Sequence, residues 1–183
     1  MQVREITALE VELLHSFRLR ALTESPEAFG ATYEEESRLP LEEVRSRFRR
    51  TDDEFVIGAF EDGGELIGVA GFFRQKLQKL RHKGAIYGMY VAPGARGRGV
   101  GKALLSRLIE RSRAVAGLEQ LTLGVVTVNE AARSLYRSQG FQTYALERGA
   151  MKQGGEYYDV EHMSLWLKGD GPVASGAGLR SQS

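Results

Sequence analysis

The chain has 183 residues, of which 42% are hydrophobic and 27% charged, and its 25 basic and 24 acidic side chains leave a formal charge of +1. These values are typical of one globular domain, exclude a disordered chain, and give no reason to expect nucleic acid or an anionic membrane as partner. The lack of cysteine excludes disulfides and a thiolate nucleophile, and with three histidines far apart in the sequence we expect no metal site.

The N-terminal part is predicted to contain a short strand and two helices. Residues 3–6 are predicted as a strand, and residues 8–22 as a helix capped by Thr7, because apolar side chains recur there at helical spacing. A second helix is expected over residues 41–50. The connector between the helices, residues 26–39, is polar and aromatic and too long for a turn, which is typical of binding loops.

The rest of the chain alternates strands and helices. An acidic turn with two glycines predicts a hairpin, and an uncharged β-branched segment predicts a central strand. The predicted elements are strands at 55–60, 66–73 and 85–91, a helix at 101–116, a strand at 121–128, a helix at 129–139, and strands at 142–146 and 157–167. We therefore expect an α/β fold, with a mixed sheet and helices on both faces, in one domain over residues 1–168. Residues 169–183 are predicted to be a glycine- and serine-rich tail.

No segment resembles a secretory leader or a membrane span. Charged residues such as Arg4, Glu5 and Glu10 interrupt the first fifteen positions, and no run approaches 18 apolar residues. We therefore expect a cytoplasmic protein that binds neither membrane nor nucleic acid.

The most informative segment joins the strand that ends at Val91 to the next helix. It contains four glycines interleaved with three cations: Gly94, Arg96, Gly97, Arg98, Gly99, Gly101 and Lys102. Glycines let several backbone N–H groups point into one concavity, and the start of a helix adds positive potential there. Charge-assisted hydrogen bonds contribute about 1.5–3 kcal/mol each, so three or four such donors would hold a pyrophosphate. A turn that only caps the helix would need fewer glycines.

The spacing excludes two familiar phosphate loops. A Walker loop would need glycine and Ser or Thr where the chain has Arg96 and Ala103. A dinucleotide fingerprint would need glycine where the chain has Lys102 or Leu104.

The loop instead resembles that of the GCN5-related N-acetyltransferase (GNAT) family, which binds the pyrophosphate of acetyl-coenzyme A. Three further segments match that family in order. They are Met89-Tyr-Val-Ala-Pro93, Asn129-Glu-Ala-Ala-Arg-Ser-Leu-Tyr136, and Gly140-Phe141. The resemblance implies a mostly antiparallel sheet of six to seven strands, acetyl-CoA as cofactor, and transfer of the acetyl group to a primary amine of a small molecule or peptide.

The resemblance also implies a role for each matching residue. The backbone from Arg96 through Gly97, Arg98, Gly99, Val100 and Gly101 to Lys102 would bind the pyrophosphate, and Met89, Tyr90 and Val91 the pantetheine. Asn129, Ala132 and Tyr136 would flank the cofactor, with the Tyr136 hydroxyl as general acid. Structural interpretations compete: Asn129 as a helix cap, Tyr136 as a core aromatic, and Arg98 as a solvated cation.

The general base has no obvious candidate on the strand where many family members carry Glu or His. That strand reads AIYGMYV, with Gly88 at the relevant place. Carboxylates from elsewhere that could accept the amine proton are Glu34, Glu35, Glu36, Asp159 and Glu161, although a surface charge run explains the three glutamates equally well. The base stays unassigned.

The acceptor pocket is expected between the first connector and the last strands. Residues that could line it are Phe29, Tyr33, Glu34, Tyr87, Tyr157 and Tyr158. Core packing explains most of these aromatic residues equally well, and fold does not choose the substrate. From the family we expect a homodimer.

Two other classes of function compete with an enzyme. One is a non-catalytic acyl-CoA-binding module, which would bind acetyl-CoA without turnover on any amine. The other is a nucleotide-binding regulatory protein, against which the failed phosphate-loop spacings argue.

Overall fold

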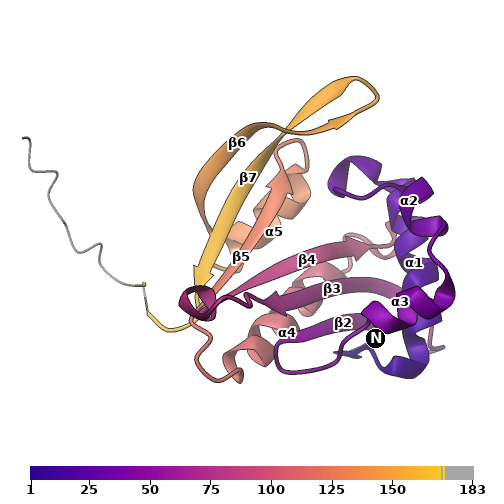
Figure 1. The fold of residues 1–183 in the computed structure, drawn as a ribbon, viewed down its shortest axis with the longest axis horizontal. Helices are drawn as coiled ribbons and strands as arrows, with labels where there is room; N and C mark the ends of the chain where they lie inside the picture. Colours follow the sequence, from indigo (N-terminus) through magenta and orange to yellow (C-terminus); the bar gives the residue numbers. More distant parts are fainter. Residues whose placement is uncertain (170, 172–183) are drawn as a thin grey trace, which may run out of the picture.

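The computed structural model describes residues 1–169 and 171, and nearly all of the predicted tail lies outside them. One seven-stranded sheet forms the centre, in the order β1-β2-β3-β4-β5-β7-β6 (Figure 1). Its strands are β1 (Gln2–Glu5), β2 (Glu54–Phe60), β3 (Leu66–Arg74), β4 (Lys83–Val91), β5 (Gln120–Val126), β6 (Gln142–Gln153) and β7 (Glu156–Trp166). Every neighbouring pair is antiparallel except β4 and β5. The prediction of a mixed α/β fold is confirmed.

Strands β4 and β5 pair over only three residues each and then separate (Figure 1). Two residues of β4, Gly88 and Met89, face one residue of β3, because the register shifts between Val69–Tyr90 and Gly71–Tyr87. Such a bulge bends its strand, and Gly88 has the positive φ of +59° that glycine adopts without strain. The wedge between the two strands therefore opens next to Gly88.

The helices cover both faces of the sheet (Figure 1). The 3₁₀ turn η1 (Ala8–Glu10), α1 (Val11–Glu24), α2 (Tyr33–Ser37) and α3 (Leu41–Arg47) come from the N-terminal part, and α4 (Val100–Arg113) and α5 (Glu130–Ser138) from the later part. None of the helices in the described residues is long and apolar enough to cross a membrane.

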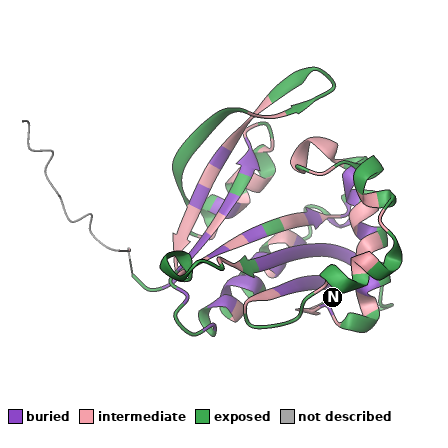
Figure 2. Ribbon diagram, viewed as in Figure 1, coloured by how far each residue is buried: buried purple, intermediate pink, exposed green. Residues whose placement is uncertain are grey.

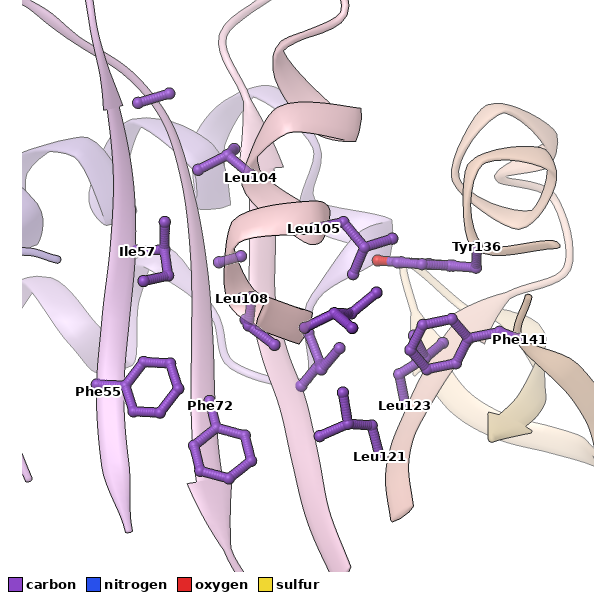
Figure 3. Close-up of a cluster of buried hydrophobic side chains, with 14 of the residues drawn as sticks. Phe55, Ile57, Phe72, Leu104, Leu105, Leu108, Leu121, Leu123, Tyr136 and Phe141 are labelled. Carbon is purple, nitrogen blue, oxygen red and sulfur yellow. The ribbon is translucent and has the colours of Figure 1, made fainter. Parts of the chain in front are cut away.

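Each face has its own hydrophobic cluster. On the α4 face, Leu104 and Leu108 pack with Phe55, Ile57 and Phe72 of β2 and β3 (Figure 3). On the α1 face the cluster contains Phe17, Ala21, Val56, Val69 and Tyr90. Successive strand residues such as Val56 and Ile57 therefore serve opposite faces. Burying a Leu or Phe side chain contributes about 1.5–3 kcal/mol, so these clusters hold the sheet between its helices.

The N-terminal helices differ from the prediction in detail. The first helix begins as the 3₁₀ turn η1, where Thr7 and Glu10 form a capping box, and Leu9 is 97% exposed rather than part of an apolar stripe. The predicted connector contains a short helix, α2, which was not predicted because its run of glutamates has no apolar periodicity. The second predicted helix ends at Arg47 because Phe48 is extended.

The last hairpin is longer than predicted. Strand β6 continues past Leu146 to Gln153 and turns at Gly154 and Gly155, which both have positive φ. Most of β6 is exposed, and the far end of the hairpin projects beyond the rest of the sheet (Figure 2). Because that part of the strand buries no face, its sequence carries no alternation of apolar and polar residues.

Candidate functional site

The glycine loop presents unpaired backbone N–H groups at the start of α4. Gly97 and Gly99 have φ of +74° and +79°, and Gly99 is the N-cap of the helix. The first hydrogen bond of α4 runs from the Ala103 amide to the Gly99 carbonyl. The amides that precede Ala103 in the first turn therefore have no acceptor within the helix. Within the described residues, the amides of 97–99 also find no backbone acceptor. The arrangement is that of an anion-binding nest.

The space in front of this loop is open. A Cβ atom placed on Gly97 or Gly99 would meet no atom within 4 Å. Gly101 differs, because a Cβ there would lie 3.0 Å from Cδ2 of Leu135 on α5. Two of the predicted glycines therefore shape the nest, while Gly101 lets α4 approach α5. The nest is therefore open to an anionic group.

The three loop cations lie in different surroundings. Arg96 donates from Nε to the Val91 carbonyl at 3.0 Å, and Arg98 forms an ion pair with Glu61 at 2.8 Å. Lys102 is exposed and forms no ion pair within the described residues. Lys102 is thus the loop cation most available to an anion, whereas Arg98 is already paired with Glu61.

A cavity of about 70 Å³ occupies the wedge between β4 and β5. Its lining includes Ile86–Met89 of β4, 123–126 of β5, and Asn129, Ala132 and Tyr136. The Asn129 side chain accepts a hydrogen bond from the Ala132 amide at 3.1 Å, so it caps α5 as well as lining the cavity. The three residues predicted to flank the cofactor are therefore brought together.

Tyr136 belongs both to the core and to this cavity. It is 7% exposed, its ring extends from α5 toward Leu105 (Figure 3), and it packs edge-on against Phe141. Its hydroxyl donates to Sδ of Met89 at 3.4 Å. Burial raises the pKa of the phenol to about 12, so it is protonated at neutral pH.

A second cavity, of about 470 Å³, lies on the α1 face of the sheet. Most of its lining is apolar, and its polar lining residues are His15, Arg18, Glu36, Arg47, Arg49 and Glu54. The two cavities share Phe29, Tyr87 and Gly88 in their linings. They therefore adjoin each other at the bulge of β4, beside Gly88.

The predicted acceptor residues do not form one group. Phe29 and Tyr87 line the 470 Å³ cavity. Tyr33, Glu34 and Tyr158 instead line a depression of about 730 Å³ between the N-terminal connector and the β6–β7 hairpin, which Phe29 also lines. Tyr157 is 67% exposed, with Lys152 over its ring.

Most of the candidate bases are engaged elsewhere. Asp159 accepts hydrogen bonds from Arg148 and from the Gly149 amide, and Glu35 belongs to a capping box. Glu36 does line the 470 Å³ cavity, where Arg18 donates to it at 2.7 Å and lowers the pKa of its carboxyl.

The carboxylate of Glu161 is buried and occupied by hydrogen bonds from three side chains. It is 4% exposed and accepts hydrogen bonds from Arg133, Arg137 and Thr143. Burial alone would raise the pKa of this carboxyl, but these hydrogen bonds outweigh it and lower the pKa to about 2. A carboxylate so weakly basic anchors α5 to β7 and is a poor proton acceptor.

Sequence reasoning missed the polar lining of the 470 Å³ cavity. Arg18 and Glu54 look like ordinary surface charges in the sequence, and His15 is isolated. They come from α1 and β2, and only the packing of α1 on the sheet brings them to one cavity. No local signal in the chain would have identified them.

Comparison with known proteins identifies the family. The sequence model described as "Acetyltransferase (GNAT) family" matches residues 18–141, which include β4, the glycine loop and α5. The chain belongs to the GNAT acetyltransferase family. The predicted family is confirmed.

Two curated relatives of this GNAT protein illustrate the range of acceptors in the family. The chain is 32% identical to L-amino acid N-acyltransferase MnaT of Escherichia coli (strain K12) over 108 residues, 58% of this chain and 62% of the relative. It is 36% identical to N-alpha-acetyltransferase RimI of Mycobacterium tuberculosis over 100 residues, 54% of this chain and 59% of the relative. The match thus spans less than two thirds of either relative.

Solved structures confirm the GNAT fold. An acetyltransferase of the GNAT family from Streptococcus pneumoniae has a TM-score of 0.82 at 24% identity, covering 90% of this chain and 98% of its own. The putative acetyltransferase yncA from Salmonella typhimurium, solved with acetyl-CoA, has a TM-score of 0.75 at 25% identity, with coverage of 97% and 99%. Acetyl-CoA is therefore the cofactor that such neighbours bind, in agreement with the predicted cofactor.

Proposed function

We propose that this GNAT protein is an N-acetyltransferase that takes the acetyl group from acetyl-CoA and transfers it to a primary amine of a small molecule. The observation that carries the proposal is the meeting of the two cavities at Gly88, one beside Tyr136 and the other open to an acceptor. A cofactor in the wedge and an amine in the 470 Å³ cavity would come into contact only there.

The nest and the open wedge suit the two parts of coenzyme A. The free amides at the start of α4, with Lys102 beside them, would hold the pyrophosphate. Beyond Ala85, the edge of β4 no longer pairs with β5, so main-chain groups around Met89 and Val91 would hydrogen-bond the pantetheine as an added strand does. When bound, acetyl-CoA supplies an acetyl group activated as a thioester.

The residues at the junction would support direct attack by a neutral amine. Gly88 leaves the approach clear, and backbone N–H groups of the bulged strand are suited to polarise the thioester carbonyl. The Tyr136 hydroxyl lines the wedge cavity and is protonated at neutral pH, so it can donate its proton toward the departing sulfur. A module that only binds acyl-CoA would have no use for this donor.

The size of the 470 Å³ cavity favours a small molecule over a protein. Its 470 Å³ lies within the roughly 300–1,000 Å³ of typical small-molecule sites, and its lining is mostly apolar with a few polar groups. A small primary amine is therefore the acceptor that we propose.

The test compares two glycine variants in a thiol-release assay with acetyl-CoA and a panel of amines. The chain has no cysteine, so the thiol reagent reads only coenzyme A. Gly99→Glu places bulk and negative charge in the nest and should abolish acetyl-CoA binding and turnover. Gly64→Glu is the matched control, because Gly64 also has a positive φ, of +85°, and open space, but lies in the β2–β3 turn. Normal acetyl-CoA affinity in Gly99→Glu, or equal loss in both variants, would refute the loop assignment.

A further inference from the structure

Arg18 on α1 reaches the point where the two cavities meet. A Cβ atom on Gly88 would lie 3.5 Å from its Nη1. Nη2 donates to Oε1 of Glu36 at 2.7 Å, and within the described residues Arg18 makes no other side-chain hydrogen bond. The guanidinium is thus anchored through Nη2, while the N–H groups of Nη1 lie beside the bulge of β4.

These N–H groups fit an anion close to the reacting amine. A guanidinium presents a planar set of donors that matches a carboxylate, with two parallel hydrogen bonds. An amine that attacks at Gly88 would have its neighbouring carbon beside Arg18. The carboxylate that suits this position is therefore one attached to the carbon that bears the amine.

The remainder of the cavity is suited to an apolar group. Its apolar lining includes Val11, Leu14, Val44, Phe48, Val56 and Val69. The other two arginines have partners of their own: Arg47 pairs with Glu43, and Arg49 donates to backbone carbonyls.

Glu54 lies at a distance from the bulge. It pairs with Phe73 of β3, which pairs with Ala85, three residues before Gly88 on β4. At about 3.3 Å per residue this separation along the sheet is roughly 10 Å. The backbone of Glu54 is therefore not next to Gly88.

We propose that the acceptor is a free α-amino acid with an apolar side chain, and that Arg18 determines this specificity by binding its carboxylate. The inference rests on the proposed function and names the substrate class of the same site. A peptide or protein N-terminus has an amide where the free amino acid has its carboxylate, and so would leave Arg18 without its anion.

The experiment compares three acceptors that differ only in the group beside the amine: L-leucine, L-leucinamide and 3-methylbutylamine. We expect kcat/KM for L-leucine to exceed that for the other two by about 30-fold or more, as expected for hydrogen bonds to a charged group. Arg18→Met should abolish this preference by lowering kcat/KM for L-leucine alone. Arg18→Lys keeps the charge but not the paired donors, so it should lower kcat/KM for L-leucine by an intermediate amount. This variant also provides the test if Arg18→Met does not fold.

Arg20→Met is the matched control on the same helix. Arg20 is exposed, pairs with Glu24 and does not line the cavity, so its loss should leave the preference for L-leucine intact. Calorimetric binding of L-leucine to the protein saturated with coenzyme A adds a readout that is independent of turnover, and we expect it to depend on Arg18.

The outcomes separate this inference from the proposed function. Equal turnover of the three acceptors, or acetylation of a peptide N-terminus without binding of L-leucine, would overturn the amino-acid assignment while leaving the transferase in place. A preference for L-lysine over L-leucine would overturn the inference that the side chain of the acceptor is apolar. Arg18-dependent binding of L-leucine with no thiol release from any amine would support the amino-acid site and refute the transferase.

Discussion

Replacing Glu161 by glutamine tests how strongly a buried carboxylate fastens helix α5, which carries Tyr136, to the sheet. Glu161 accepts hydrogen bonds from Arg133 at 2.5 Å and Arg137 at 2.8 Å, and also from Thr143 of β6. The two arginines are one helical turn apart on α5, so a single carboxylate ties that helix to two strands. Glutamine has nearly the same shape but no charge, so it removes the ion pairs with little change in volume.

The pKa of Glu161 sets the expected magnitude. It falls from 4.5 to about 2 in the folded protein, because the three hydrogen bonds outweigh the opposing effect of burial. At about 1.4 kcal/mol per pKa unit, the ionised carboxylate stabilises the fold by about 3 kcal/mol at neutral pH. We expect Glu161→Gln to lower the free energy of unfolding by about that amount, as is usual when one partner of a buried ion pair is removed.

The sign of the pH dependence follows from the lowered pKa. The stabilisation is fully present above the unfolded-state pKa of 4.5 and is lost as the pH falls toward 2. The difference in unfolding free energy between wild type and Glu161→Gln should therefore shrink by about half at pH 3.

Urea denaturation at pH 7 and pH 3, followed by circular dichroism, measures both quantities. Glu156→Gln is the control on the same strand, because Glu156 is exposed and forms no ion pair within the described residues. A loss at pH 7 no larger than that of the control, or a difference that does not change with pH, would refute the reasoning.

The remaining predictions concern the junction of the two cavities. Tyr136→Phe should lower kcat by about 10²-fold while acetyl-CoA affinity stays within a few-fold, measured by thiol release and calorimetry, with exposed Tyr157→Phe as control. An unchanged kcat would remove Tyr136 from the mechanism. Gly88→Ala should cost about 1 kcal/mol in unfolding free energy, because alanine is strained at a φ of +59°, and should raise the KM of the acceptor. Unchanged stability and KM would contradict the proposal that acceptor and cofactor meet at the bulge of β4.

The sequence by itself determined the family, the order of the elements and the glycine loop that precedes α4. These features depend on local backbone conformations, and the types of residue that favour those conformations can be recognised in the sequence. Gly97 and Gly99 occupy left-handed conformations that other residues avoid, and Asn129 caps the helix that it precedes. Where local patterning was weak, as in the exposed part of β6 and the glutamate-rich α2, the prediction missed an element or its end.

Only the tertiary structure decided how the site is composed. Nothing near Arg18 in the sequence distinguishes it from a surface charge, although it lies beside the junction of the two cavities. Likewise, nothing near Glu161 shows that it is a buried anchor and not a candidate base. Their surroundings come from elements far apart in the chain, and the acceptor aromatics divide between two cavities for the same reason. Packing of α1 and α5 on opposite faces of the sheet sets these contacts, and burial and charge pairing then decide what each side chain can do.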